Sequence, residues 1–247
     1  MLRRIFIKGE ITDDSLIYLD KKSINHAINV LRLKNNGKFI AVDGNGNEYI
    51  SEIADYTKGI ARIISINKSE SNRVTAVNLY LAVIKQQRFE IALEKCTELG
   101  VNSVTPVKCK NSLPLDITEN RVKRFNTILE QASRQCGRLH IPLLHTASTF
   151  EKVITVGNSE ETLIAHSTSE NDNITVPNIT TISAHTSYNI FIGPEGGFTA
   201  EEINIAIENN AKIINLGQNI LRTETAAIAV CSFIMTGPFL HKGLHPY

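Results

Sequence analysis

The chain has 247 residues, of which 42% are hydrophobic and 21% are charged. This composition supports a packed core and excludes wholesale disorder, and the length allows one large domain or two modest ones. Lys and Arg total 26 against 25 Asp and Glu, a formal net charge of +1. That balance excludes a histone-like nucleic-acid binder but not RNA binding through a local basic patch.

Features that the sequence lacks bear on the cellular location of the protein, on the state of its cysteines and on whether it binds a metal. It has no run of about 18 apolar residues, and its start lacks the apolar core of a signal peptide, so we expect a cytoplasmic protein. The four cysteines form no CxxC pair, which favours free thiols. The histidines show no HExxH or other ligand spacing, so no metal site is predicted.

The first seventy residues predict short strands and turns around one helix. Asp43-Gly44-Asn45-Gly46-Asn47 is a hairpin signal, because Gly and Asn tolerate positive φ. Apolar residues at helical spacing predict a helix over 23–33, and a polar stretch at 67–73 is read as a linker. The predicted strands cover residues 3–7, 37–42, 48–53 and 59–66. This pattern indicates a small β-barrel-like module.

From residue 74 onward, strands alternate with helices, which is typical of a parallel α/β sheet. Gly100 ends one predicted helix, and Thr199 with Glu202 forms a capping-box pattern at the start of another. The predicted strands cover residues 74–84, 101–107, 163–165, 189–192 and 213–216. The predicted helices cover residues 88–99, 118–137, 199–209 and 223–235, and 168–187 is read as a loop.

Two turns of this region follow strands and open helices, where ligands bind in parallel α/β domains. The first, 192–198 (IGPEGGF), is rich in glycine but is neither a Walker loop nor GxGxxG, so a phosphate cradle is a weak reading. An ordinary strand-to-helix turn explains its glycines equally well. In the second, 216–227, Arg222 and Glu224 stand beside an apolar helix, where buried charges need partners or a function. The alternative is a helix cap, with Thr223 as the N-cap and Glu224 favoured by the helix dipole.

Taken with four earlier motifs, these two turns resemble the small-subunit ribosomal RNA uridine-N3 methyltransferases, the RsmE family of the SPOUT superfamily. The six motifs span nearly the whole chain and come in the family's order. They are 26–32 (HAINVLR), 85–90 (KQQRFE), 95–101 (KCTELGV), 132–142 (ASRQCGRLHIP), 192–198 (IGPEGGF) and 216–226 (LGQNILRTETA). The chain departs from the family pattern at Asn25, Gln86 and Arg134.

The resemblance implies a PUA-like RNA-binding barrel over 1–70 and a SPOUT methyltransferase domain over 73–247, a parallel-sheet domain tied in a trefoil knot. It implies that loops of the knot hold S-adenosylmethionine at a homodimer interface. The residues it assigns to the cofactor are Ile192, Gly193, Pro194, Gly197, Leu216, Gly217, Ile220, Leu221 and Thr225. A neutral, apolar, glycine-lined pocket suits an adenine and a sulfonium better than a phosphate.

The implied reaction is methyl transfer to N3 of a uridine in small-subunit ribosomal RNA, with the assembled subunit as the expected substrate. Losing the N3 proton leaves charge on the uracil oxygens, which a guanidinium can stabilise. We assign this role to Arg222, with Glu195 or Glu224 orienting groups or accepting the proton, although solvent is an alternative acceptor. The cations and the histidine proposed to contact RNA are Arg3, Arg4, His26, Arg32, Arg88 and Arg138.

Two other functions compete with this reading. A non-catalytic RNA-binding assembly factor would keep the fold, but it would have little reason to retain both Arg222 and Glu224. A SPOUT enzyme acting on transfer RNA would lack the element through His26 and Arg32, which resembles the small-subunit family.

Overall fold

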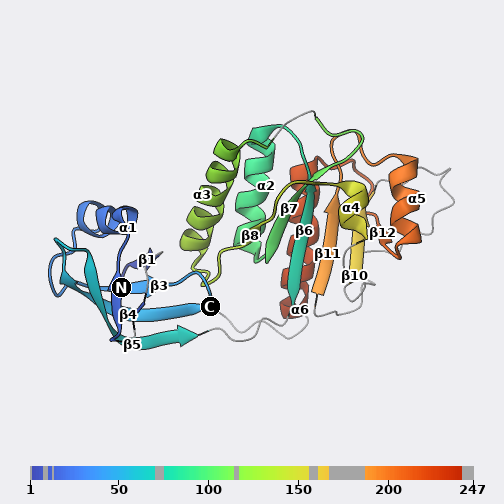
Figure 1. Cartoon of the computed structure of the whole chain (residues 1–247). Helices are drawn as coiled ribbons and strands as arrows, with labels where there is room; N and C mark the ends of the chain where they lie inside the picture. The colour runs from blue at the N-terminus through green and yellow to red at the C-terminus, as the bar shows by residue number, and fades with distance from the viewer. Residues whose placement is uncertain are drawn as a thin grey trace. The chain divides into compact units, whose positions relative to one another are not determined.

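The computed structural model describes residues 2–7, 11–12, 14–69, 75–113, 117–155, 161–166 and 187–240. The chain forms two compact units, and Figure 1 shows the elements of each. The first unit spans Met1–Arg73 together with Ser133–Ile141, and the second spans Val74–Ala132 together with Pro142–Tyr247. The later segment joins the first unit because Leu139 packs against Phe6 and Val42.

The first unit is built on a five-stranded, curled sheet in the order β1-β3-β4-β5-β2. The pair β1 and β3 is parallel, and the other neighbours are antiparallel. The strands are β1 (Arg4–Phe6), β2 (Leu16–Tyr18), β3 (Lys38–Val42), β4 (Asn47–Asp55) and β5 (Ile60–Ser69). The predicted hairpin is confirmed: Asp43 Oδ1 accepts hydrogen bonds from the backbone N–H groups of Asn45 and Asn47, and Gly44 and Gly46 have positive φ.

The helix of the first unit differs from the single helix predicted over 23–33. It consists of α1 (Lys21–Asn25), capped by the Asp20 carboxylate on Ser23 N, and a π-helical turn, η1 (His26–Val30). Leu31 N donates to His26 O, and Leu33 N donates to Ala27 O. Each acceptor lies further back in the sequence than the acceptor of an α-helical hydrogen bond, so the turn is wider than an α-helical turn. β5 also extends into the predicted linker, whose residues 70–73 lie outside the described part of the chain.

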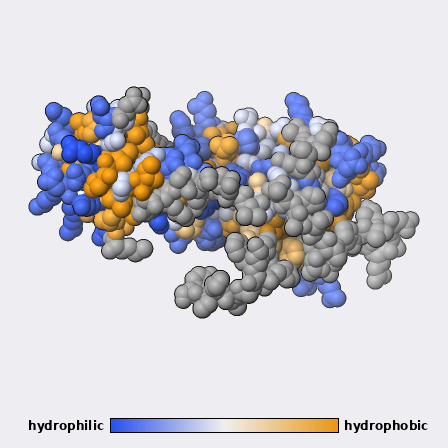
Figure 2. All heavy atoms as spheres, turned by 90° about the horizontal axis from the view of Figure 1, so that it is seen from below, coloured by the Kyte–Doolittle hydropathy of each residue, from blue (hydrophilic) through white to orange (hydrophobic). Residues whose placement is uncertain are grey.

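The core of the first unit forms between the curled sheet and this helix. Ile17, Phe39 and Ala61 are fully buried in it. Figure 2 shows hydrophobic residues gathered on one outer face of this unit. Ile64 and Ile66 of β5 remain exposed, as single apolar side chains on protein surfaces often do.

The second unit contains a sheet in the order β12-β10-β11-β6-β7-β8, and every pair is parallel, as the alternating pattern predicts. The short strand β9 (Ser148–Thr149) also pairs with β7. The main strands are β6 (Ala76–Ala82), β7 (Ser103–Lys108), β8 (Leu143–Leu144), β10 (Glu161–Ala165), β11 (Ser187–Ile192) and β12 (Lys212–Ile214). The predicted loop at 168–187 lies outside the described residues except for Ser187, which begins β11.

Helices cover both faces of this sheet, with α4 in front and α6 behind in Figure 1. On one face, Phe150 of α4 and Ile203 of α5 pack with Phe191 of β11. On the other face, α6 packs against β6, β11 and α2. The helices are α2 (Gln86–Leu99), α3 (Glu119–Cys136), α4 (Phe150–Ile154), α5 (Ala200–Glu208) and α6 (Thr223–Leu240). Across the described part of the chain, no helix is long and apolar enough to span a membrane.

Candidate functional site

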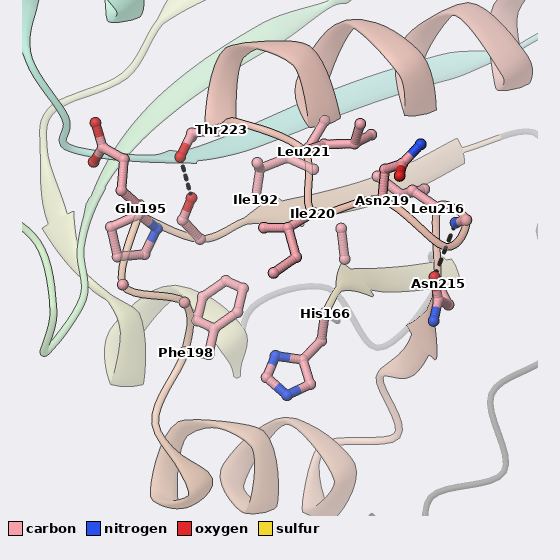
Figure 3. A pocket seen from close by; sticks show the side chains of 17 residues that line it. His166, Ile192, Glu195, Phe198, Asn215, Leu216, Asn219, Ile220, Leu221 and Thr223 are labelled. Atoms are coloured by element: carbon pink, nitrogen blue, oxygen red, sulfur yellow. Dashed lines mark hydrogen bonds between the residues drawn. The ribbon is translucent and has the colours of Figure 1, made fainter. Parts of the chain in front are cut away.

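A cavity of about 280 Å³ lies where β10, β11 and β12 end, and the segments that follow these three strands form its wall (Figure 3). This is the edge where parallel α/β sheets bind ligands. Its volume lies near the lower end of the range of roughly 300–1,000 Å³ for small-molecule sites. The lining residues are Ala165, His166, Ile192, Gly193, Pro194, Glu195, Gly196, Gly197, Phe198, Asn215, Leu216, Gly217, Asn219, Ile220, Leu221, Thr223 and Ala226.

The first pocket loop, residues 193–198, needs glycine for two different reasons. A Cβ on Gly193 would lie 3.0–3.3 Å from the Phe198 ring, so only glycine permits this packing. Gly197 has a φ of +69°, and its N–H donates to Pro194 O at 2.9 Å, which closes a tight turn. Among the described residues, no atom lies within 4 Å of a Cβ built on Gly197. The loop backbone is therefore closely packed at Gly193, whereas there is free space beside it at Gly197.

The second pocket loop, residues 215–222, is joined to the first through the start of α6. Thr223 Oγ1 donates a hydrogen bond to Gly193 O at 2.9 Å (Figure 3). The sequence pattern offered Thr223 as a helix cap, and in the structure its hydroxyl instead ties two loops of the pocket together. Gly217 has a φ of +121° and open space in its Cβ direction, like Gly197.

Beside the pocket, three charged residues from different parts of the sequence come together. Arg88 Nη1 lies 2.9 Å from Glu195 Oε1, and Arg88 Nε lies 3.8 Å from Glu224 Oε1. Glu195 lines the pocket, although its carboxylate points away from the cavity in Figure 3. Glu224 is only 9% exposed, and its Oε2 has no hydrogen-bond partner among the described residues. The structure thus places two glutamates that were predicted to act in catalysis beside an arginine that was predicted to contact RNA.

Arg222 and Thr225 are placed differently from the other predicted site residues. The Arg222 side chain is exposed on the loop before α6, and neither residue is among those that line the pocket. The other eight residues assigned to the cofactor all line it. The catalytic role of Arg222 and the cofactor contact of Thr225 stay predictions.

Several residues that line the pocket were not assigned to the cofactor from the sequence. His166, Phe198, Asn215, Asn219 and Thr223 line the cavity in addition to the predicted residues. His166 follows the last residue of β10, and Asn215 follows the last residue of β12. Their position was available from the sequence: ligands bind beyond the carboxyl ends of parallel strands, His166 directly follows one predicted strand, and Asn215 lies near the end of another.

Most of the residues predicted to contact RNA belong to the first unit. Arg4 Nε lies 2.9 Å from Glu48 Oε2, and the Glu48 side chain is 1% exposed. Burial, followed by the charges of Arg134 and Lys22, lowers the pKa of His26. Arg3 and Arg32 are exposed, and Arg138 is half-buried. Their contacts with RNA stay predictions.

The residues at which the chain departs from the family pattern make local contacts. Gln86 Nε2 donates to Glu90 Oε1 at 2.7 Å, and Arg124 Nη2 donates to Glu90 Oε2 at 2.6 Å. The Arg134 guanidinium lies 5.8 Å from the centre of the Phe6 ring. Among the described residues there is no group of His, Cys, Asp and Glu that could hold a metal ion; His185, His241 and His245 lie outside them.

Comparison with known proteins gives family matches for both parts of the chain. A family model described as an RNA methyltransferase domain matches residues 70–235, and one described as an RNA methyltransferase PUA domain matches residues 19–64. A ribosomal RNA small subunit methyltransferase E of Mesomycoplasma hyopneumoniae is 32% identical over 229 residues, covering 91% of this chain and 95% of the relative. Its counterpart in Rickettsia conorii is 27% identical over 228 residues, covering 91% of each chain.

Solved structures share the fold over almost the whole chain. A Legionella pneumophila protein solved with the cofactor SAM has a TM-score of 0.83 at 26% identity, covering 96% of this chain and 98% of that one. A ribosomal RNA small subunit methyltransferase E from Neisseria gonorrhoeae has a TM-score of 0.83 at 24% identity, with the same coverage. The fold is the expected SPOUT-type knotted α/β domain with a PUA-like domain before it. On these matches and this architecture, the chain belongs to the ribosomal RNA small subunit methyltransferase E family.

Proposed function

We propose that this protein is an S-adenosylmethionine-dependent methyltransferase that methylates N3 of a uridine in small-subunit ribosomal RNA. The observation that carries the proposal is the glycine-rich pocket at the ends of three parallel strands, in a chain of this family. The Legionella pneumophila relative, which shares the fold at 26% identity, was solved with SAM bound.

The pocket has the chemistry that this cofactor requires. Among the residues that line it there is no Lys or Arg, so it is unlike a phosphate site. Open space beside the Cβ positions of Gly197 and Gly217 leaves room for a ligand against the backbone. Ile192, Leu216 and Leu221 supply apolar walls for the adenosyl and methionine parts. When bound, S-adenosylmethionine supplies an electrophilic methyl group on a sulfonium.

The charged residues around the pocket would handle the proton and charge of the uracil. The N3–H must lose its proton before N3 can act as a nucleophile, and the base must leave its stack to be reached. Glu224 Oε2 is buried and lacks a hydrogen-bond partner among the described residues, the state expected of an acceptor whose donor arrives with the substrate. Glu195 is held by Arg88 and would orient groups at the pocket mouth. Exposed Arg222 would stabilise the charge on the uracil oxygens.

The partners we propose follow from the same reading. The cations of the PUA-like unit would contact phosphates of the assembled small subunit, and the activity would take place in the cytoplasm. Ile220 lines the pocket yet is 88% exposed, and a second copy of the chain in a homodimer would cover it.

The direct test is methyl transfer from labelled S-adenosylmethionine to small ribosomal subunits that lack the modification, followed by digestion and nucleoside mass analysis. Naked ribosomal RNA and transfer RNA are run in parallel. Label recovered as 3-methyluridine from the subunits is the expected result. Label in transfer RNA alone would redirect the assignment. An absence of label in every sample, with cofactor binding measured separately, would favour a binding factor.

A further inference from the structure

One side chain holds the glycine-rich pocket loop from outside the cavity. Asn111 Nδ2 lies 3.1 Å from Gly196 O and 3.1 Å from Gly197 O. A side-chain amide carries two N–H donors, so a single asparagine can satisfy both carbonyls. Asn111 is not among the residues that line the pocket. The backbone also approaches it closely, because a Cβ on Gly196 would lie 3.1 Å from the Asn111 Cβ.

Asn111 is itself fixed by a closed turn after β7. Ser112 N donates to Cys109 O at 3.1 Å, and Cys109 N donates to Ser112 Oγ at 3.0 Å. The first and last residues of the 109–112 turn therefore each donate a hydrogen bond to the other. The neighbouring Lys110 N donates to Glu202 Oε1 at 2.8 Å.

Glu202 connects this turn to the far end of the pocket loop. Its residue is 1% exposed, and its Oε2 accepts a hydrogen bond from Thr199 N at 2.8 Å as part of the capping box of α5. One buried carboxylate therefore anchors both the turn that carries Asn111 and the helix that follows the loop.

The loop needs support on this side because its other side is the cavity. Gly197 has positive φ, and no side chain of the described residues packs against it in its Cβ direction. Glycine backbone loses more conformational freedom on ordering than any other residue. Hydrogen bonds from Asn111, on the side of the loop away from the cavity, reduce the conformational freedom of the unliganded loop without filling the pocket. The loop then loses less entropy when a ligand binds.

We propose that Asn111 is a positioning residue of the cofactor site: its side-chain amide holds the Gly196 and Gly197 carbonyls and keeps the loop in the shape that receives S-adenosylmethionine. The inference rests on the proposed function. It adds a residue that lies outside the family motifs quoted above and outside the pocket lining. It predicts an effect on cofactor affinity rather than on the chemical step, because Asn111 shapes the loop that receives the cofactor and is not itself among the residues that line the pocket.

The test replaces the donor while keeping the shape of the side chain. In the Asn111→Asp variant, a carboxylate oxygen faces the two carbonyls in place of Nδ2. We expect the Kd for S-adenosylmethionine, measured by calorimetry on the full chain, to rise at least tenfold. The KM for the cofactor should rise in parallel, while kcat at saturating cofactor stays within about twofold. Asn111→Ala, which removes the donor without adding charge, should raise the Kd in the same direction and serves if the aspartate variant does not fold.

Asn126→Asp is the matched control. Asn126 Nδ2 also donates to a backbone carbonyl, Val122 O, from an exposed position on α3. This variant should bind the cofactor as the wild type does. A second readout needs no cofactor: hydrogen exchange of residues 193–198 in the unliganded protein should become faster in both Asn111 variants and stay unchanged in the control.

The outcomes separate the two proposals. Wild-type affinity and wild-type loop exchange in both Asn111 variants would overturn the positioning role and leave the proposed function intact. Faster loop exchange with unchanged affinity would also overturn it, because the brace would then not serve cofactor binding. A wild-type protein that does not bind S-adenosylmethionine would overturn the proposed function itself.

Discussion

Arg88, in the first turn of α2, donates a hydrogen bond of 2.9 Å to Glu195 on the pocket wall, across 107 positions of the sequence. The Nε of the same guanidinium lies 3.8 Å from Oε1 of Glu224, the buried glutamate at the start of α6. One arginine therefore links the first pocket loop to the helix that follows the second. The Arg88 side chain is 30% exposed, so it is not fully enclosed by these two partners.

Removing this arginine should affect both stability and turnover. Glu224 is 9% exposed in the wild type, and Arg88→Ala removes the cation beside it; leaving a buried charged group poorly satisfied costs about 1–3 kcal/mol. We expect the free energy of unfolding in urea to fall by that order and kcat/KM for the RNA substrate to fall at least tenfold. Lys95→Ala, on the same helix, is the control, because Lys95 forms ion pairs with Glu94 and Glu98, which are partly exposed residues of α2 itself. Wild-type stability in Arg88→Ala would contradict the linking role.

Replacing Arg222 should lower turnover without lowering stability, because its side chain is exposed and no ion pair that involves it occurs among the described residues. Arg222→Ala should keep the wild-type melting temperature and the wild-type affinity for S-adenosylmethionine. Losing a donor to a developing oxyanion lowers kcat by roughly 10²–10³-fold, which is the loss we expect here. Arg222→Lys should recover part of the rate, since it keeps the charge. Full turnover by the alanine variant would remove Arg222 from the mechanism.

The sequence predicted local features of the fold well because their causes are local. The hairpin at 43–47, the capping box of Thr199 and Glu202, and the end of α2 at Gly100 each depend on residues within a few positions of one another. The parallel sheet followed from alternating strands and helices. The π-helical turn at His26–Val30 was missed, because it differs from an α-helix in the number of residues between the donor and the acceptor of each backbone hydrogen bond.

The site was predictable where a motif lies on one loop and not where distant segments meet. Glycines at 193, 197 and 217 mark the pocket in the sequence itself. The pairing of Arg88 with Glu195 and the brace from Asn111 depend on how α2 and the end of β7 lie against the loop. Thr225 and Thr223 illustrate the limit. The predicted start of the helix at residue 223 is confirmed, yet of these two threonines Thr223 alone lines the cavity, because the way α6 lies against the pocket loops decides which side chains of its first turn face the cavity.

The contact between Gly193 and Phe198 can be tested with a substitution at Gly193 and a second substitution at Phe198 that should partly reverse its effect. In Gly193→Ala, the new Cβ would sit 3.0–3.3 Å from the Phe198 ring, which is too close on a rigid aromatic side chain. We expect weaker S-adenosylmethionine binding by calorimetry. Adding Phe198→Leu should restore part of the affinity by removing ring atoms. If the double variant binds no better than Gly193→Ala alone, a cause other than this contact operates.

The four cysteines should differ sharply in reactivity, because burial controls access and ionisation. Burial, together with the charge of Glu202, raises the pKa of Cys109 to about 12, and a hydrogen bond with Cys231 and burial raise the pKa of Cys96. Cys136 is exposed. At pH 8, iodoacetamide should add a single label to the native protein and four labels in denaturant, counted by intact mass. Substitution of Cys136 by serine should abolish the native label; labelling that persists would place the reactive thiol elsewhere.

His26 should make the first unit less stable at mildly acidic pH. Burial, then the charges of Arg134 and Lys22, lowers the pKa of His26 below its ordinary value of 6.5. In the window between that value and the lower folded pKa, the unfolded chain binds more protons, so the free energy of unfolding falls as the pH drops through it. Comparing melting temperatures at pH 7.5 and 5.5, we expect a smaller decrease for His26→Gln than for the wild type. The exposed His145→Gln variant should match the wild type. Equal decreases in all three proteins would show that protonation of His26 does not oppose folding.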